Sequence, residues 1–165
     1  MMQPAGHHLA EFNFGVLRHD WDDPRVAEFA DNLDRVNALA VESPGYVWHM
    51  SDEEMDAGQK NPDGVFGGNP RTASMLSVWA DAQSLHHYVW KTAHRDYYDK
   101  RRDWFDAEGN SNLVMWWVPV DHRPDLMEGM ARFDHLNEYG ETDHAFGWKR
   151  LAPLLKWARK REQYA

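Results

Sequence analysis

The chain has 165 residues, a length that predicts a single domain with a core of its own. It has no cysteine, which excludes a disulfide framework, thiolate metal sites and a cysteine nucleophile. Lys and Arg total 18 and Asp and Glu total 27, and the net charge of −9 disfavours nucleic acid as a partner because an acidic surface repels phosphate. No apolar run approaches the ~20 residues that cross a bilayer, so we expect no membrane partner and a cytoplasmic protein.

The first part of the chain predicts two strands around one helix. Residues 8–18 alternate between two faces, which indicates a strand. Asp23 is suited to cap a helix whose apolar side chains recur at helical spacing as far as Ala40. The helix should end before the Ser-Pro-Gly of residues 43–45, and residues 46–50 predict the second strand.

The middle of the chain predicts a loop, a strand and a long helix. Residues 51–70 are polar, acidic and rich in Gly and Pro, which is typical of a long loop, either a lid or a disordered hairpin tip. Residues 71–80 predict the third strand. Asp81 then caps a second helix that extends to Phe105, and residues 91–93 are a place where this helix can bend.

The last third predicts one more strand of the sheet and further helices. Residues 112–120 are apolar on both faces, which is typical of a central strand. A turn at His122 leads into a third helix that ends at Gly140. A short strand over residues 145–149 and an amphipathic helix over residues 151–158 complete the prediction.

The order of the elements predicts the architecture. A βαββαβ order with extra C-terminal helices indicates an α+β ferredoxin-like fold over residues 1–148. Residues 149–165 carry six basic side chains and one acidic one, and we expect them to form a basic, partly helical tail. Two helices cover one face of such a sheet, whereas strands 71–80 and 112–120 are apolar on both faces. We therefore expect a second subunit on the other face, in a homodimer joined sheet to sheet.

Short motifs follow one another in a fixed order between residues 8 and 148. They are HLAEFN (8–13), VNALA (36–40), SPGYVW (43–48), LSVW (76–79), TAH (92–94), RRDWF (101–105), WWVP (116–119) and HRP (122–124). In this set the chain resembles the family catalogued as domain of unknown function 3291. The resemblance implies the dimeric α/β-barrel superfamily, whose members include antibiotic-biosynthesis monooxygenases, polyketide cyclases and haem proteins of the chlorite dismutase and dye-peroxidase kind. It also implies a pocket between the sheet and the inner faces of the helices.

One predicted helix face carries candidate chemistry for such a pocket. His94, Tyr98 and Arg101 share that face through their i, i+4, i+7 spacing. His94 can take or give a proton near neutral pH, and Arg101 or Arg102 can stabilise an anion. Adjacent helical residues point about 100° apart, so one of the two arginines faces inward. The structural alternative is that His94 binds a backbone carbonyl and the arginines pair with nearby Asp residues.

The strands supply candidate substrate contacts. Asn13 and Ser77 are polar positions within apolar strands, so they need partners, either a ligand or each other. Trp48, Trp79 and Trp117 are candidates for an aromatic wall, although packing in the core or in a subunit interface explains tryptophans at least as well.

Metal and phosphate motifs are missing from the sequence. The adjacent pairs His7-His8 and His86-His87 do not share a face, and no HExxH or Gly-rich phosphate fingerprint occurs. We therefore expect no metal ion and no cofactor, with haem as the alternative, His94 being its axial ligand.

These observations lead to one leading hypothesis and two alternatives. The leading hypothesis is a small enzyme that oxygenates, isomerises or cyclises a small apolar or aromatic molecule, as in natural-product tailoring. His94 would act as acid or base, and Arg101 or Arg102 would stabilise the anion. The alternatives are a haem protein of the same fold and a non-catalytic ligand-binding dimer.

Overall fold

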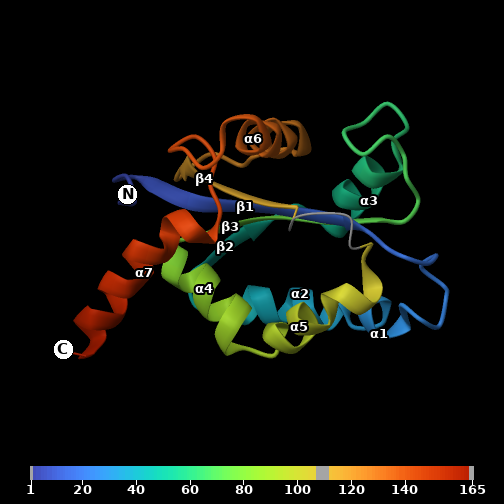
Figure 1. The fold of residues 1–165 in the computed structure, drawn as a ribbon, viewed down its shortest axis with the longest axis horizontal. Coiled ribbons are helices and arrows are strands. Elements are labelled where there is room, and N and C mark those ends of the chain that lie inside the picture. Colours follow the sequence, from blue (N-terminus) through green and yellow to red (C-terminus); the bar gives the residue numbers. More distant parts are fainter. Residues whose placement is uncertain (1, 107–111, 164–165) are drawn as a thin grey trace.

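A four-stranded sheet forms the centre of the molecule (Figure 1). The computed structural model describes residues 2–106 and 112–163. The strands are β1 (His7–Val16), β2 (Tyr46–His49), β3 (Thr72–Trp79) and β4 (Leu113–Pro119), which lie in the order β2-β3-β1-β4. All three neighbouring pairs are antiparallel, and helices lie on both faces of the sheet. The predicted α+β class is confirmed.

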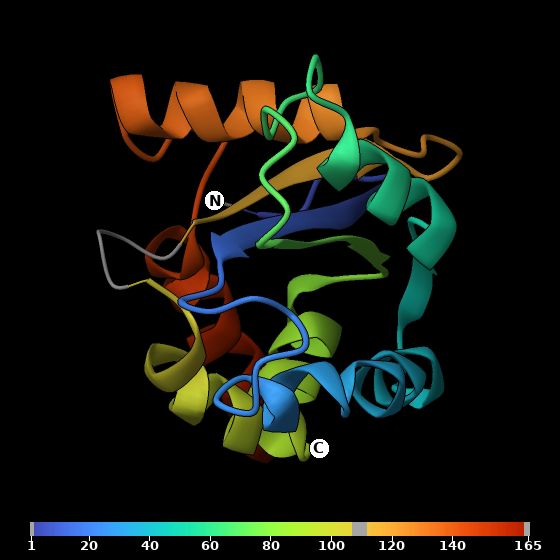
Figure 2. The same cartoon turned by 90° about the vertical axis from the view of Figure 1, so that its right-hand side faces the viewer.

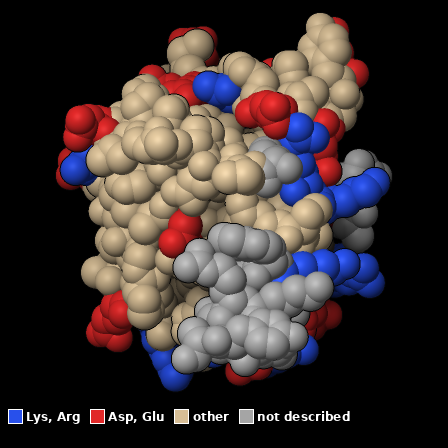
Figure 3. All heavy atoms as spheres, turned by 90° about the vertical axis from the view of Figure 1, so that its left-hand side faces the viewer, with Lys and Arg blue, Asp and Glu red and all other residues tan. Residues whose placement is uncertain are grey.

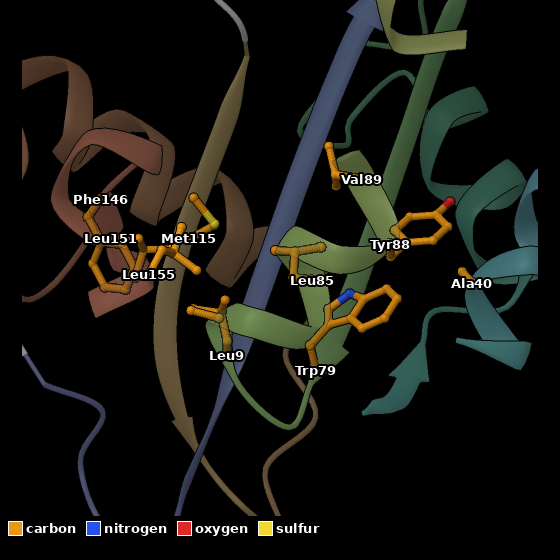
Figure 4. Close-up of a cluster of buried hydrophobic side chains, with 11 residues drawn as sticks. Leu9, Ala40, Trp79, Leu85, Tyr88, Val89, Met115, Phe146, Leu151 and Leu155 are labelled. Carbon is orange, nitrogen blue, oxygen red and sulfur yellow. The ribbon is translucent and has the colours of Figure 1, made fainter. Parts of the chain in front are cut away.

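The alternation of each strand divides its side chains between two faces. The face that we call the cavity face carries Leu9, Glu11 and Asn13 of β1, whose partners in β3 are Trp79, Ser77 and Met75. Four helices lie below this face in Figure 1: α1 (Ala27–Ala30), α2 (Leu33–Glu42), α4 (Ala82–Lys91) and α5 (His94–Trp104). One cluster of buried side chains packs here: Leu9, Ala40, Trp79, Ala82, Leu85, Tyr88, Val89, Met115, Phe146, Leu151 and Leu155 (Figure 4).

The opposite face, which we call the α6 face, is covered by the same chain. Helices α6 (Leu126–Tyr139) and α3 (Asp52–Lys60) lie over it (Figures 1 and 2). A second cluster is buried there: Ala10, Phe12, Met55, Leu76, Val78, Val114, Trp116, Val118 and Ala145. Trp116 donates its Nε1–H to the Glu128 carboxylate at 2.8 Å, so its buried nitrogen has a partner on α6.

This packing corrects the expectation of a bare sheet face. The apolar residues that the sequence assigned to a second subunit are buried beneath α3 and α6. The reason is that the third predicted helix, α6, packs against the sheet after β4 and covers this face. The homodimer stays a prediction, but a bare sheet face no longer provides its reason.

The first predicted helix is divided in two. Helix α1 covers Ala27–Ala30 and helix α2 covers Leu33–Glu42, so the single helix expected from Asp23 to Ala40 is wrong. Asn32, between the two helices, donates from its side-chain amide to the Glu28 carbonyl at 2.8 Å. Such side-chain bonds to the backbone compete with helix continuation, as is common for Asn.

The loop expected over residues 51–70 is also corrected. Its first half is helix α3, which begins with a capping box: the Ser51 hydroxyl accepts from the Glu54 N–H at 3.3 Å, and the Glu54 carboxylate accepts from the Ser51 N–H at 3.2 Å. Met55 is its buried anchor. The segment from 61 to 71 connects α3 to β3 without further regular structure.

The long second helix bends where the sequence permits it. Helix α4 (Ala82–Lys91), capped by Asp81, and helix α5 (His94–Trp104) are separated at Thr92. The Thr92 hydroxyl donates to the Tyr88 carbonyl at 2.6 Å and accepts from the His94 N–H at 3.2 Å. This side chain therefore ends α4 and begins α5.

The C-terminal segment joins the core. Phe146 makes one isolated bridge to Met115, so the strand expected over residues 145–149 is wrong, and helix α7 (Trp148–Gln163) begins inside it. Leu151 and Leu155 are buried in the cavity-face cluster, which makes this part of the basic segment a component of the domain. The surface on the side of the N-terminus and α7 is formed largely by residues that are neither acidic nor basic (Figure 3). No helix in the described parts of the chain is long and apolar enough to span a bilayer.

Candidate functional site

A cavity of about 1440 Å³ lies between the cavity face of the sheet and the helices that cover it. Strand residues line one side of it, and residues of α1, α2, α4 and α5 line the other; Figure 2 shows α1 and α2 below the sheet. Residues of α3 and Trp148 at the start of α7 also contribute to the lining. Protein sites for small organic molecules measure roughly 300–1,000 Å³. The cavity is thus large enough for such a molecule together with water.

Most of the residues predicted as candidates meet at this cavity. Its lining includes seven of them: Asn13, Ser77, Trp79, His94, Tyr98, Arg101 and Arg102. They come from β1, β3 and α5, which are distant in the sequence. The structure thus brings these side chains to one place, while the roles assigned to them stay predictions.

Two predicted tryptophans lie elsewhere. The pairing of β2 with β3 shifts register between Tyr46 and Trp48, so Trp48 turns to the α6 face, where the Arg123 guanidinium lies 5.6 Å from its ring centroid. Trp117 faces α7 at the far end of the sheet, with its ring 5.6 Å from that of Phe146. Neither lines the large cavity, so the structure does not bring them together with the other candidates, and their contact with a ligand stays a prediction.

Glu11, the most unusual side chain of the cavity, was not among the residues predicted from the sequence. It is 5% exposed, and it lies between two neutral donors. Its carboxyl group accepts from the Asn13 amide at 2.6 Å and from the Ser77 hydroxyl at 3.0 Å. Ser77 in turn accepts from Trp79 Nε1–H at 3.1 Å, which fixes the direction of its hydroxyl group.

The electrostatic environment of Glu11 favours its protonated form. Desolvation raises the pKa of the Glu11 carboxyl from 4.5 to about 7, against the opposing effect of the hydrogen bonds from Asn13 and Ser77. Both protonation states are therefore present near neutral pH, which suits a group that transfers protons. A charged residue with Asn two positions further along a strand, on the same face, was the signal available in the sequence.

An aromatic wall extends from Glu11 towards α5. The rings of Trp79 and Tyr88 are stacked with centroids 5.1 Å apart, and the Tyr88 ring lies 4.6 Å from the imidazole of His94. Figure 4 shows Trp79 and Tyr88 beside each other. Burial, and secondarily the charge of Glu11, raises the pKa of Tyr88. Its hydroxyl remains protonated and donates to the Val36 carbonyl at 3.3 Å.

His94 is partly buried at the start of α5. Desolvation lowers the pKa of its imidazole, so the ring is neutral at pH 7. Its Nδ1 lies 3.4 Å from the Val89 carbonyl, the contact that the structural alternative predicted, and this assigns the proton to Nδ1 and leaves Nε2 able to accept one.

The two arginines of α5 differ in their surroundings. Arg101 is half-buried; its guanidinium lies 3.9 Å from the Tyr98 ring centroid and donates to the Tyr98 carbonyl at 2.7 Å. Arg102 is exposed. Both line the cavity, but Arg101 is the one that its own contacts hold in place.

Other histidines lie outside this site. His122 contacts the Glu128 carboxylate at 2.6 Å in the first turn of α6, so it belongs to the α6 face. Within residues 2–106 and 112–163, no three His, Cys, Asp or Glu side chains are grouped as a metal ion would require.

Comparison with known proteins identifies the family. The model of the family described as "Domain of unknown function (DUF3291)" matches residues 8–162. The chain belongs to this family. The DUF3291 match includes Glu11 and every other residue that lines the cavity, and it continues into α7, beyond residue 148.

Beyond the DUF3291 match, the comparisons are sparse. A solved structure with some similarity is the NE2512 protein of unknown function from Nitrosomonas europaea. It is 14% identical, the alignment covers 74% of this chain and 99% of that one, and the TM-score is 0.46. No curated protein matches the sequence significantly.

Proposed function

We propose that this DUF3291 chain is a small-molecule enzyme that holds an apolar or aromatic organic molecule in its cavity and moves a proton with the Glu11 carboxyl group. One observation supports this above the others: a buried carboxyl group borders a large cavity and is held by neutral donors. Buried carboxyl groups without a cationic partner are costly, and functional sites are where they gather.

The proposed chemistry begins with removal of a proton from carbon. Ionised Glu11 takes the proton, and the resulting carbanion is the intermediate from which isomerisation, cyclisation or cofactor-free oxygenation can proceed. Neutral His94 is the second proposed acid–base group, and Arg101, with Arg102 nearer the solvent, would stabilise an anionic group at the other end of the molecule.

The finer fold assignment is part of the same proposal. The strand order β2-β3-β1-β4 with antiparallel neighbours supports a ferredoxin-like sheet, to which α3, α6 and α7 are additions. The family resemblance supports the dimeric α/β-barrel superfamily, a homodimer, a monooxygenase-like relationship and a role in natural-product tailoring within the cytoplasm. Light scattering at micromolar concentration would test the homodimer.

The proton-transfer step can be tested without knowing the natural substrate. The probe is 5-nitrobenzisoxazole, in which a base removes the proton from carbon, the N–O bond breaks and a coloured phenolate forms. We expect the protein to open this ring faster than free acetate does, with a rate that rises with pH through about 7, where Glu11 ionises.

Two variants decide the outcome. Glu11→Gln keeps an amide oxygen to accept from Asn13 and places its N–H₂ against the Ser77 hydroxyl, which can accept, but it removes the base. It should lose on the order of 10²–10⁴ in rate. The control is Glu138→Gln, an exposed site on α6 that should behave like the parent. A Glu11→Gln variant as active as the parent would falsify the proposal, and a non-catalytic binding protein would then be favoured.

Haem binding at His94 is a second candidate, and one specific observation favours it. The His94 ring is neutral, borders the cavity, and has its Nδ1 against a backbone carbonyl, an arrangement that presents Nε2 to a metal. His94 would hold the iron, and the bound haem would supply oxygen or one-electron chemistry. Added haemin should show a Soret band that is sharper than, and shifted from, that of free haemin, and His94→Ala should abolish this change; an unchanged spectrum would remove this candidate.

A further inference from the structure

A second proton-bearing group lies in the same row of the sheet as Glu11. Glu11 of β1 pairs with Ser77 of β3, and Ser77 pairs with His49 of β2. Side chains directly opposite each other on neighbouring strands share a face, with Cβ atoms about 5 Å apart. Carboxyl, hydroxyl and imidazole therefore follow one another across the cavity face, and all three residues line the cavity.

Tyr46 holds the imidazole of His49 from the side. The Tyr46 hydroxyl lies 2.5 Å from His49 Nδ1, and the two rings have centroids 5.7 Å apart. Desolvation raises the pKa of Tyr46, so the phenol keeps its proton at neutral pH and is able to donate it to Nδ1. We assign the bond in this direction. With Nδ1 accepting, the ring proton is on Nε2, which becomes a hydrogen-bond donor.

We propose that His49, oriented by Tyr46, binds the oxyanion that forms when Glu11 removes a proton, and that the substrate is an enolisable carbonyl compound with an apolar or aromatic body. This inference rests on the proposed function. In the step, the C–H proton moves to the Glu11 carboxylate, the C–H electron pair forms a carbon–carbon double bond, and the carbonyl π pair moves onto oxygen. His49 Nε2–H donates to that oxygen, and Glu11 then returns the proton to the same or another carbon, so no oxidant or reductant is needed.

The spacing of the row suits this division of roles. Two strand spacings place the backbones of Glu11 and His49 about 10 Å apart, and both side chains extend into the cavity. The gap admits a carbonyl group and its neighbouring carbon between the two. The Trp79 ring meets that of Tyr46 edge-on at 5.8 Å and stacks on that of Tyr88, so an aromatic body can lie against the wall beside the row.

A neutral donor is also the type of group that Glu11 requires. A cation beside the oxyanion would lower the pKa of Glu11 and hold its carboxylate in the ionised form, which is a weaker base. An uncharged N–H donor stabilises the developing charge without that penalty. The arrangement therefore combines a strong carboxylate base with an oxyanion donor in one cavity.

Binding of 4-nitrophenolate tests the oxyanion site separately from the base. This anion resembles an aromatic enolate, and its absorbance reports its ionisation state. The parent for the experiment is Glu11→Gln, which mimics the protonated carboxyl group and removes charge repulsion. We expect this parent to bind the probe as the anion, with a shifted spectrum.

Substitutions of His49 should then change the affinity in a graded way. Adding His49→Phe should weaken binding by about tenfold to a hundredfold, the value of one hydrogen bond to a charged group. His49→Gln keeps a side-chain N–H donor and should restore most of the affinity, and Tyr46→Phe should weaken it severalfold because Nδ1 loses its fixed partner. His87→Gln, exposed on α4 and outside the cavity lining, is the control and should leave the affinity unchanged.

The outcomes separate this inference from the proposed function. If 4-nitrophenolate does not bind the parent, or binds the His49→Phe and His49→Gln variants equally well, the oxyanion assignment is overturned, while loss of ring opening in Glu11→Gln would still support the base. If Glu11→Gln keeps its ring-opening activity, the proposed function fails first. Circular dichroism of each variant shows whether it is folded, and Tyr46→Phe provides the test if His49→Phe is not.

Discussion

At the scale of one residue, the ionisation of Glu11 affects both the proposed proton transfer and the free energy of unfolding. Its pKa is about 7 when folded and 4.5 in the reference state, so between these values the folded protein holds a proton that the unfolded chain has lost. Stability is therefore fully present below pH 4.5 and falls as the pH rises through about 7. The shift corresponds to roughly 3 kcal/mol of stability lost once the pH is well above 7.

Glu11→Gln should therefore stabilise the protein in a pH-dependent way. At pH 8.5 we expect its free energy of unfolding to exceed that of the parent by up to about 3 kcal/mol, because the buried charge is gone. The difference should shrink towards pH 5, where Glu11 is protonated in the folded parent. Urea unfolding from pH 5 to 8.5 measures it, with Glu138→Gln as the control. A difference that does not depend on pH would contradict the raised pKa.

The same residue shows where sequence reasoning stops. Alternation placed Glu11 and Asn13 on one strand face, but a charged strand residue is usually exposed. Its burial depends on Ser77, which lies 66 positions away, and on the helices that close the cavity. His49 was not predicted because regular alternation places Trp48, not His49, on the same face as Tyr46. The register shift between Tyr46 and Trp48 puts His49 on the cavity face and Trp48 on the α6 face. The burial of Glu11 and the position of His49 both depend on pairing between strands that are distant in the sequence. Local sequence patterns do not show which strands pair or in what register.

At the scale of elements, α6 shows how closely a helix approaches the sheet. Gly129 is buried over Phe12, and a Cβ built at Gly129 would lie 2.9 Å from Phe12 Cγ. Phe12 is fully buried in the α6-face cluster and cannot move aside easily. Glycine at this position therefore sets the distance between helix and strand.

Gly129→Ala should reverse the usual effect of alanine in a helix. Alanine normally stabilises a helix interior by about 1 kcal/mol relative to glycine, but overpacking costs about 1–3 kcal/mol. We expect a net loss in the free energy of unfolding. Ala131→Gly, on the exposed side of the same helix, measures the ordinary difference, a loss of about 1 kcal/mol. A stabilised Gly129→Ala protein would mean that α6 does not pack on Phe12 as described.

The elements also differ in how well their sequences predict them. Strands β1, β3 and β4 follow from alternation or apolar runs, and Asp81 and Gly140 mark helix ends correctly. Helix α3 was missed because it has a single buried residue, Met55, and no apolar periodicity. Its signal was the pair Ser51 and Glu54, a capping box within an acidic stretch that resembles a loop.

At the scale of the whole molecule, α7 closes the end of the cavity-face core. Leu151 is fully buried among residues of that cluster, which includes Leu9 and Met115. It does not line the cavity. A substitution of Leu151 should therefore change the free energy of unfolding without changing the cavity.

Leu151→Ala should test that separation. We expect it to lower the free energy of unfolding by about 2–5 kcal/mol, the usual cost of removing a buried leucine side chain. Ring opening of 5-nitrobenzisoxazole per folded molecule should not change. Lys156→Ala, exposed on the same helix, should alter stability by less than about 0.5 kcal/mol. A small effect of Leu151→Ala in denaturant titrations would show that α7 is not part of the cooperative unit.

The cavity affects how readily the helices below the sheet open locally. Of the four helices that lie below the sheet in Figure 1, α1 has no buried residue, α2 buries Ala40 and α5 buries Trp104, whereas α4 buries four side chains. Segments with few buried apolar contacts open locally at a small cost in free energy. Backbone amides of α1, α2 and α5 should therefore exchange with deuterium well before those of β1 and β3. A molecule that fills the cavity would supply additional apolar contacts to these helices. Slowed exchange in α1, α2 and α5 would therefore identify compounds that bind in the cavity.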